Sequence, residues 1–237
     1  MTKKKSSNLM NYAGTFGALV ILCVVLAIAS PNFFKYSNMM SILKQTSFNA
    51  LVSTGMLLCL ITAGIDLSVG SVLALSTAFC AGMIVAGIPV PVAMLAALVI
   101  GVIFGVVSGF LVTKGRLQPF IATLITMTVY RGVTMIYTEG KPISGLGTSA
   151  FLKFIGKGAV FGIPFPVIVL VVVFAIFYFV LNKTTFGRRI YATGSNAECA
   201  KLAGVNINKT KLIAYGVSGL MSAMAGLILL SRLSSAQ

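Results

Sequence analysis

Histidine is absent from this chain and acidic side chains are scarce. The 237 residues include three Asp or Glu and no His, against 18 Lys or Arg. Without His, neither a His-based general acid or base nor an HExxH metal site can form. Three scattered carboxylates also argue against an intramembrane hydrolase. We therefore expect no catalytic residue, no bound metal and no cofactor.

Several short motifs are missing as well. The sequence contains no GxxxxGK[ST] phosphate-binding loop, no GxSxG nucleophile motif and no CxxC pair. Any ATP-driven work would therefore need a separate ATPase chain. Of the four cysteines, Cys23, Cys59 and Cys80 lie in apolar runs and Cys199 lies in a basic stretch. This pattern indicates packing residues, and neither a disulfide framework nor a metal site.

Apolar residues are what the chain has in excess. Hydrophobic residues make up 58% of it, charged residues 9%, and the mean hydropathy is +1.03. Soluble domains carry about 25% charged residues, so lipid must solvate this surface. A net charge of +15 in a soluble protein would point to nucleic acid. Here the basic residues fall between apolar runs, which indicates topology signals and contacts with anionic lipid.

The apolar runs predict an all-α, polytopic transmembrane bundle with about seven spans. The N-terminal run resembles a signal peptide, but it is long enough to span a bilayer and further spans follow, so we interpret it as an uncleaved first span. Residues 64–67 alone separate the second and third spans, which indicates that one of them is broken or re-entrant. The predicted spans are 12–30, 46–64, 68–87, 90–113, 119–138, 163–182 and 212–231.

The basic residues predict the orientation. With the N-terminus inside, eleven Lys or Arg fall inside and five outside. The positive-inside rule therefore favours a cytoplasmic N-terminus.

Small residues recur at four-residue spacing in three spans. Gly101, Gly105 and Gly109 share one face of the fourth span. Ala74, Ala78, Gly82 and Ala86 do so in the third, and Gly219, Ser222, Ala223 and Gly226 cluster in the seventh. Such faces allow close helix packing in lipid, which predicts a compact bundle and no particular function.

Three polar residues within or near the spans are candidates for a translocation path. Asp66 either lines the path or caps the helix that begins near Leu67 and Ser68, and the sequence around it favours the cap. Arg131 either extends to an interface or pairs inside the bundle, and both readings stay open. Asn49 is a weaker candidate.

A polar stretch at 182–211 follows the sixth span and lies inside in this orientation. It holds six basic residues and Glu198. Asn196 fits an N-cap and Gly204 the position after a helix C-terminus, which predicts a short helix at 196–203, the only compact element expected there. The stretch is either an ordinary basic loop, which the residues alone favour, or a docking site for a partner.

A set of ordered blocks resembles the permease subunit of bacterial ribose ABC importers, within the monosaccharide permease family. The similarity covers essentially the whole chain. The blocks are 30–34 (SPNFF), 64–71 (GIDLSVGS), 120–124 (FIATL), 131–138 (RGVTMIYT), 202–209 (LAGVNINK), 225–226 and 232–237 (RLSSAQ).

The resemblance implies a function and partners. It implies one permease domain over 1–237 in the bacterial inner membrane, forming a path for a monosaccharide, D-ribose above others. An external sugar-binding protein, an ABC ATPase and a second permease copy are the implied partners. It also implies that the helix within 182–211 couples to the ATPase, through Asn196, Glu198, Ala200, Leu202 and Gly204.

Two points accompany this reading. Family members continue past Gln237, so we expect the chain to be truncated at its C-terminus. The alternative class is a secondary transporter of a small polar solute, which would need intramembrane carboxylates. Asp66 and Glu139 are the residues available for that role.

Overall fold

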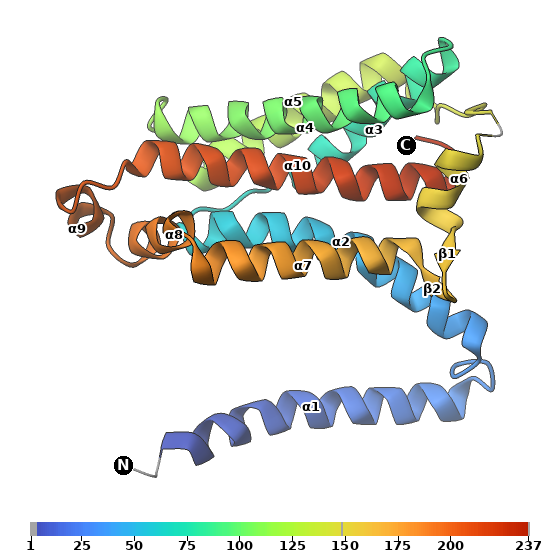
Figure 1. Cartoon of the computed structure of the whole chain (residues 1–237), viewed down its shortest axis with the longest axis horizontal. Helices are drawn as coiled ribbons and strands as arrows, with labels where there is room; N and C mark the ends of the chain where they lie inside the picture. The colour runs from blue at the N-terminus through green and yellow to red at the C-terminus, as the bar shows by residue number, and fades with distance from the viewer. Residues whose placement is uncertain (1–3, 148, 237) are drawn as a thin grey trace. The chain divides into compact units, whose positions relative to one another are not determined.

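Long helices occupy all the predicted spans in a computed structural model, which describes residues 4–147 and 149–236 (Figure 1). The all-α expectation is confirmed for these residues, apart from one short strand pair. The helices that match the spans are α1 (Lys4–Ala29), α2 (Tyr36–Ile61), α3 (Val69–Val85), α4 (Val90–Thr113), α5 (Pro119–Thr138), α7 (Phe165–Lys183) and α10 (Ile207–Leu233).

Four of these helices are both long and apolar enough to cross a membrane. They are α4, α5, α7 and α10, while Ala13–Ala29 and α3 are apolar but shorter. Polar residues occur in α2 up to Thr54, among them Lys44, Gln45, Thr46 and Asn49, and its last two turns are apolar. The chain is therefore a multi-pass membrane protein with one helix of mixed polarity.

The chain divides into two units, residues 1–43 and 44–237. In the first unit, α1 ends before the turn that contains Pro31. The Phe33 and Phe34 rings meet edge to face at 4.9 Å. Asn38 Nδ2 donates to the Phe33 carbonyl at 2.8 Å, which ties this turn to the first turn of α2.

Close packing between α4 and α10 centres the second unit. A side chain at Gly105 would overlap the Tyr215 carbonyl, and one at Gly101 would overlap the Gly219 carbonyl. The predicted glycine face of α4 is therefore a contact face for α10. Gly226 meets Thr77 and Leu73 of α3 in the same way. In the most apolar stretch of α10, 67% of the residues are buried. The helix lies between α3 and α4 on one side and α2 and α7 on the other (Figure 1).

Short elements complete the two ends of this unit. At one end α6 (Ala150–Lys157) precedes β1 (Ala159–Val160) and β2 (Ile163–Pro164), which pair antiparallel. Ser231 of α10 donates to the Leu152 carbonyl and accepts from the Gly156 N–H, so α6 is fixed to the end of α10. At the other end lie α8 (Thr185–Ser195) and α9 (Ala197–Leu202).

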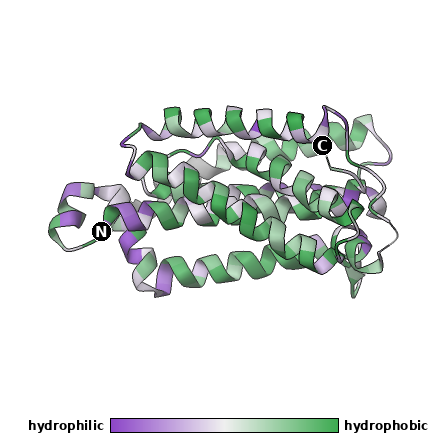
Figure 2. Ribbon diagram, turned by 90° about the horizontal axis from the view of Figure 1, so that it is seen from above, coloured by the Kyte–Doolittle hydropathy of each residue, from purple (hydrophilic) through white to green (hydrophobic). Residues whose placement is uncertain are grey.

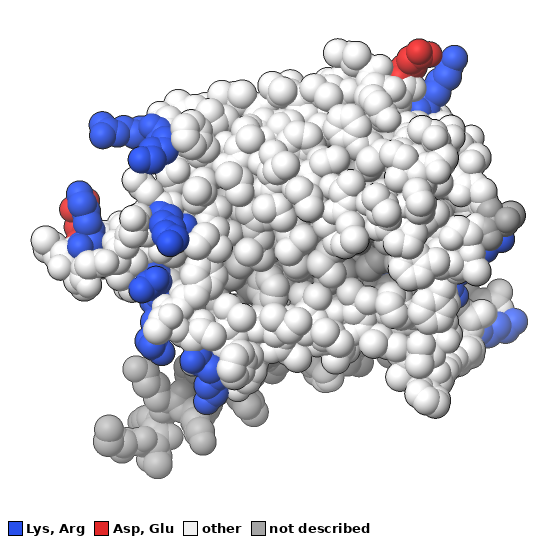
Figure 3. All heavy atoms as spheres, turned by 45° about the horizontal axis from the view of Figure 1, so that its top comes forward, with Lys and Arg blue, Asp and Glu red and all other residues white. Residues whose placement is uncertain are grey.

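Polar residues concentrate at the helix ends and connections, and apolar residues along the helices (Figure 2). On the face shown in Figure 3, Lys and Arg gather at the two ends and leave the surface between them uncharged. An apolar band flanked by basic ends is the arrangement that a bilayer requires.

Candidate functional site

The connection between α2 and α3 is a helix break buried inside the second unit. Ala63 has a left-handed backbone (φ 56°) and the Gly64 N–H bonds the Cys59 carbonyl at 2.9 Å, which ends α2 with a Schellman motif. Residues 62–68 then run without helical structure to α3. Irregular backbone at membrane depth is tolerated only where protein or water satisfies its polar groups. The short 64–67 spacing predicted a broken or re-entrant span; α2 and α3 are each continuous, and the irregular backbone lies between them.

Asp66 lies in this break and is 1% exposed. One carboxyl oxygen accepts from the Ser68 N–H at 2.9 Å and from the Ser68 hydroxyl at 2.6 Å. The other accepts from the Ser218 hydroxyl of α10 at 2.7 Å. Asp66 thus binds a backbone N–H beside the helix start, but the N-cap of α3 is Ser68, whose side chain makes no capping bond, and α3 begins at Val69, slightly later than predicted.

The neighbouring backbone and hydroxyl groups are satisfied by other helices. The Ile65 carbonyl accepts from Tyr215 Oη at 3.1 Å and from Thr123 Oγ1 at 3.3 Å. Ser108 of α4 donates to Thr126 of α5 at 3.0 Å and lies 3.4 Å from the Ser68 hydroxyl. We call Asp66, Ser68, Ser108, Thr126 and Ser218 the Asp66 cluster.

The Asp66 cluster is suited to holding helices together rather than to catalysis. It joins the break to α4, α5 and α10 through hydroxyl groups around one carboxyl group. Within residues 4–147 and 149–236, no group of three His, Cys, Asp or Glu could hold a metal ion. Sequence reasoning missed Ser218 and Tyr215, because nothing near Asp66 in the chain indicates residues about 150 positions away.

The other two path candidates lie apart from Asp66. Arg131 is exposed on α5 and lines a small surface hollow with Lys141 and Pro142 from the loop that follows. Asn49 is exposed on α2 and lines a groove between α2 and α7. The three candidates therefore do not converge on one site.

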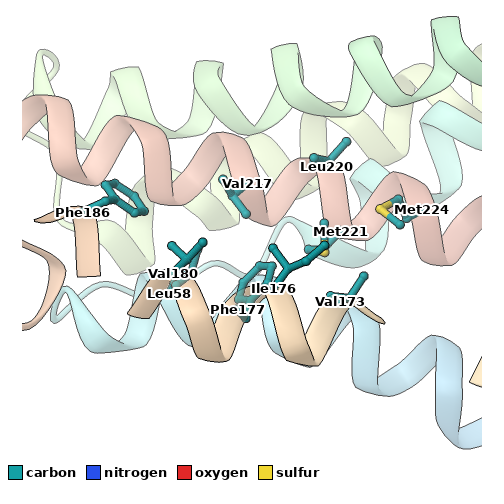
Figure 4. Close-up of a pocket in the computed structure, with 10 residues that line it drawn as sticks. All are labelled: Leu58, Val173, Ile176, Phe177, Val180, Phe186, Val217, Leu220, Met221 and Met224. Atoms are coloured by element: carbon teal, nitrogen blue, oxygen red, sulfur yellow. The ribbon is translucent and has the colours of Figure 1, made fainter. Parts of the chain in front are cut away.

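An apolar cavity of about 380 Å³ lies between α2, α7, α8 and α10 (Figure 4). Its ten lining residues are aliphatic, aromatic or Met, including Leu58, Phe177 and Met221. These side chains offer a hydroxylated solute no hydrogen-bond partner, so this cavity does not fit a polar cargo.

The predicted helix at 196–203 is present as α9, and its boundary signals are confirmed. Asn196 Oδ1 accepts from the Cys199 N–H at 3.0 Å, and Gly204 has φ 81°. Glu198 lies exposed in the first turn. Leu202 is 88% exposed, an unusual position for a large apolar side chain in a polar segment.

One expectation about this segment was wrong, namely that α9 is its only compact element. Ala200, which the resemblance assigns to the ATPase contact, is only 4% exposed and supports α9 against the protein, whereas Ala203 lies on the surface. The segment also contains a second compact element, α8, which sequence reasoning missed. Phe186, Ile190 and Thr193 repeat at helical spacing on its inner face, and this pattern could have revealed it.

Helix α8 packs mainly against α7 and α10 and approaches the end of α2 closely at Gly194. Ile190 is fully buried, in a cluster with Leu58, Cys59 and Tyr215. A side chain at Gly194 would overlap the Ile61 carbonyl, the last residue of α2 before the break. Helix α8 therefore lies between the surface helix α9 and the end of α2, where the connection that holds Asp66 begins.

Comparison with known proteins agrees with this architecture. The sequence pattern of the family described as branched-chain amino acid transport system, permease component, matches residues 38–237. The chain belongs to this family of membrane-spanning transport subunits, a class of transporters rather than enzymes. The expectation of an ABC importer permease is confirmed, and the secondary-transporter alternative is not supported.

Named relatives cover nearly all of the chain. The ribose import permease protein of Haemophilus influenzae is 48% identical over 225 residues, which are 94% of this chain and 70% of the relative. That of Bacillus subtilis is 46% identical over 228 residues, 96% of this chain and 71% of the relative. The L-arabinose transport system permease protein of Escherichia coli is 40% identical over 233 residues, which are 94% of this chain and 68% of the relative. No solved structure matches the chain.

Proposed function

We propose that this permease forms the membrane path of an ATP-driven importer for a monosaccharide, with D-ribose as the preferred cargo. The observation that carries the proposal is the 48% and 46% identity to two ribose import permease proteins, against 40% for an arabinose permease. A neutral cargo also suits a chain with three acidic residues, of which Asp66 is the buried one among the residues that the structure describes.

The energy for import arrives through a separate ATPase that docks on α9. Leu202 is the anchor for that contact, because an exposed apolar side chain at the centre of an interface contributes more affinity than charges at its rim. Asn196 and Gly204 hold the ends of the helix, and Ala200 seats it on the protein. A hollow of about 510 Å³ beside Glu198, Lys201 and Asn208 gives the partner further surface.

Movement at α9 reaches the membrane through α8. The contact of Gly194 with Ile61 places α8 against the end of α2. A shift of α8 would therefore move α2 and the break at Asp66 together. This route explains how docking outside the bilayer changes a path inside it.

The remaining assembly follows from the same function. The permease resides in the bacterial inner membrane with its N-terminus and the 182–211 segment in the cytoplasm, as the basic residues favour. An external binding protein delivers the sugar, a second permease copy contributes to the path, and residues 1–237 belong to one permease domain.

The test is uptake of labelled sugars. Cells without their own ribose permease would express the full-length permease together with the ATPase and binding protein of its transport system. We expect D-ribose to accumulate in preference to glucose and galactose, and only with an active ATPase. Uptake of a hexose but not ribose would refute the cargo while leaving the family intact.

A further inference from the structure

A groove of about 830 Å³ runs between α2 and α7 in the second unit. This volume lies within the ~300–1,000 Å³ typical of small-molecule sites. One wall is polar and comes from α2, and the other is aromatic and comes from α7. The lining residues are Thr46, Asn49, Ala50, Ser53, Thr54, Leu57, Phe174, Phe177, Tyr178, Leu181 and Asn182.

The polar wall does not suit contact with lipid. Thr46, Asn49 and Ser53 follow one another at three- and four-residue spacing on one face of α2, and all three are exposed. Asn side chains in contact with hydrocarbon are costly, because nothing there replaces their hydrogen bonds with water. A stripe of this kind on a helix of a membrane protein indicates a face turned towards water or towards a polar cargo.

The groups on this wall are hydrogen-bond donors and acceptors without charge. The Ser53 hydroxyl donates to the Asn49 carbonyl at 2.9 Å and the Thr54 hydroxyl to the Ala50 carbonyl at 2.7 Å, which leaves lone pairs on both oxygens as acceptors. The Asn49 amide offers both donors and acceptors. Asn182 adds a second amide at the end of α7.

The aromatic wall complements these groups. Tyr178 is 67% exposed, and Phe174 lies exposed one turn before it on α7. Aromatic faces pack against the C–H surface of a sugar ring while amides and hydroxyls bind its hydroxyl groups. No Lys, Arg, Asp or Glu lines the groove in the described residues, so an amino acid would find no partner for its ammonium or carboxylate group.

We propose that this groove is a wall of the translocation path, with Asn49, Ser53 and Asn182 hydrogen-bonding a neutral sugar and Tyr178 packing on its ring. The proposal rests on the proposed function and names the residues that the sugar contacts as it crosses the membrane. From Thr46 to Leu57 the groove follows α2 for about 16 Å at 1.5 Å per residue. This length is roughly half of the ~30 Å hydrocarbon core.

A labelling experiment tests whether the groove holds water, independently of transport. Asn49→Cys and Ser53→Cys would be made in a chain whose four native cysteines are replaced, and treated in membranes with a charged methanethiosulfonate reagent. Val99→Cys and Val129→Cys are matched controls on exposed apolar faces of α4 and α5. We expect the groove cysteines to react at least about tenfold faster, because the reactive thiolate forms only where water stabilises it.

Two labelling outcomes would overturn the proposal. Equally slow reaction at all four positions would show that the groove faces lipid. Disulfide cross-linking between copies through Asn49→Cys, without labelling, would show that the groove is an interface between permeases.

A transport experiment tests the contacts with sugar. Asn49→Leu and Tyr178→Leu should each lower sugar uptake roughly threefold to tenfold, the loss expected for one hydrogen bond or packing contact, at unchanged permease abundance. Thr128→Val, which removes an exposed hydroxyl of α5, is the control and should leave uptake unchanged. Normal uptake by both groove variants would overturn the proposed role of the groove alone, whereas no sugar uptake by the unaltered full-length permease would overturn the proposed function.

Discussion

The Ser218 hydroxyl donates to the Asp66 carboxyl group at 2.7 Å and joins the break after α2 to the middle of α10. Ser218 lies about 16 Å from the start of α10 at 1.5 Å per residue, well inside the apolar part of that helix. Because the other carboxyl oxygen binds Ser68, one side chain holds the start of α3 against α10. Asp66 thus holds the irregular backbone in place at a buried position, where water cannot supply hydrogen bonds to its polar groups.

Two substitutions of Asp66 should show whether its hydrogen bonds or its negative charge matter. Asp66→Asn keeps an oxygen for Ser68 and an amide for Ser218, so we expect normal folding and most transport. Asp66→Leu leaves two buried hydroxyls and an N–H without an acceptor and should lower the free energy of unfolding by about 1–3 kcal/mol. The midpoint of unfolding in detergent and sugar uptake are the measurements. An Asp66→Asn chain that folds normally but does not transport would mean that the negative charge itself is required.

The contact between α4 and α10 should not accept one additional carbon. Gly105→Ala places a Cβ against the Tyr215 carbonyl, so the helices must separate. We expect a loss of about 1–3 kcal/mol, the usual effect of overpacking. Gly132→Ala is the matched control, since a Cβ there meets open space on α5 and improves helix propensity by up to ~1 kcal/mol. Equal unfolding midpoints for the two variants would contradict this account of the helix pair.

The predicted orientation can be read from single cysteines in a chain without the native ones. Lys114→Cys and Ser195→Cys lie at exposed positions after α4 and at the end of α8, and should be shielded from an impermeant thiol reagent in intact cells. Lys153→Cys, exposed on α6, should react. The reason is the eleven-to-five distribution of basic residues. Labelling of Ser195→Cys in sealed cells would invert the topology and remove the proposed ATPase contact.

Leu202→Asp should disconnect the permease from its ATPase. The side chain is 88% exposed, so the variant should insert and accumulate normally while ATP-driven uptake falls at least about tenfold, as expected for an interface anchor. Leu117→Asp makes the same substitution at another exposed leucine, after α4 and outside this hollow, and serves as the control. Co-purification of the ATPase and sugar uptake would be measured together. If Leu202→Asp keeps both, the docking surface lies elsewhere.

The sequence by itself determined the class and most of the helices. Apolar runs near 20 residues specify spans because the bilayer, rather than a tertiary partner, sets their length. The ends of α9 were also predictable, since Asn196 and Gly204 act on backbone within a few residues of themselves. Even the break at 62–68 was visible as a gap too short for a normal loop between two spans.

Tertiary structure alone decided which groups meet. Ser218 is 152 residues from Asp66, and their hydrogen bond depends on how α10 is rotated against α4 by the glycines between them. The burial of Ala200 and the exposure of Leu202 depend in the same way on how α8 seats against the end of α2. The groove beside Asn49 exists because α7 lies opposite α2, and no local pattern encodes that arrangement. Lipid solvates every apolar helix face equally well, so close packing between particular helices determines which helices lie side by side.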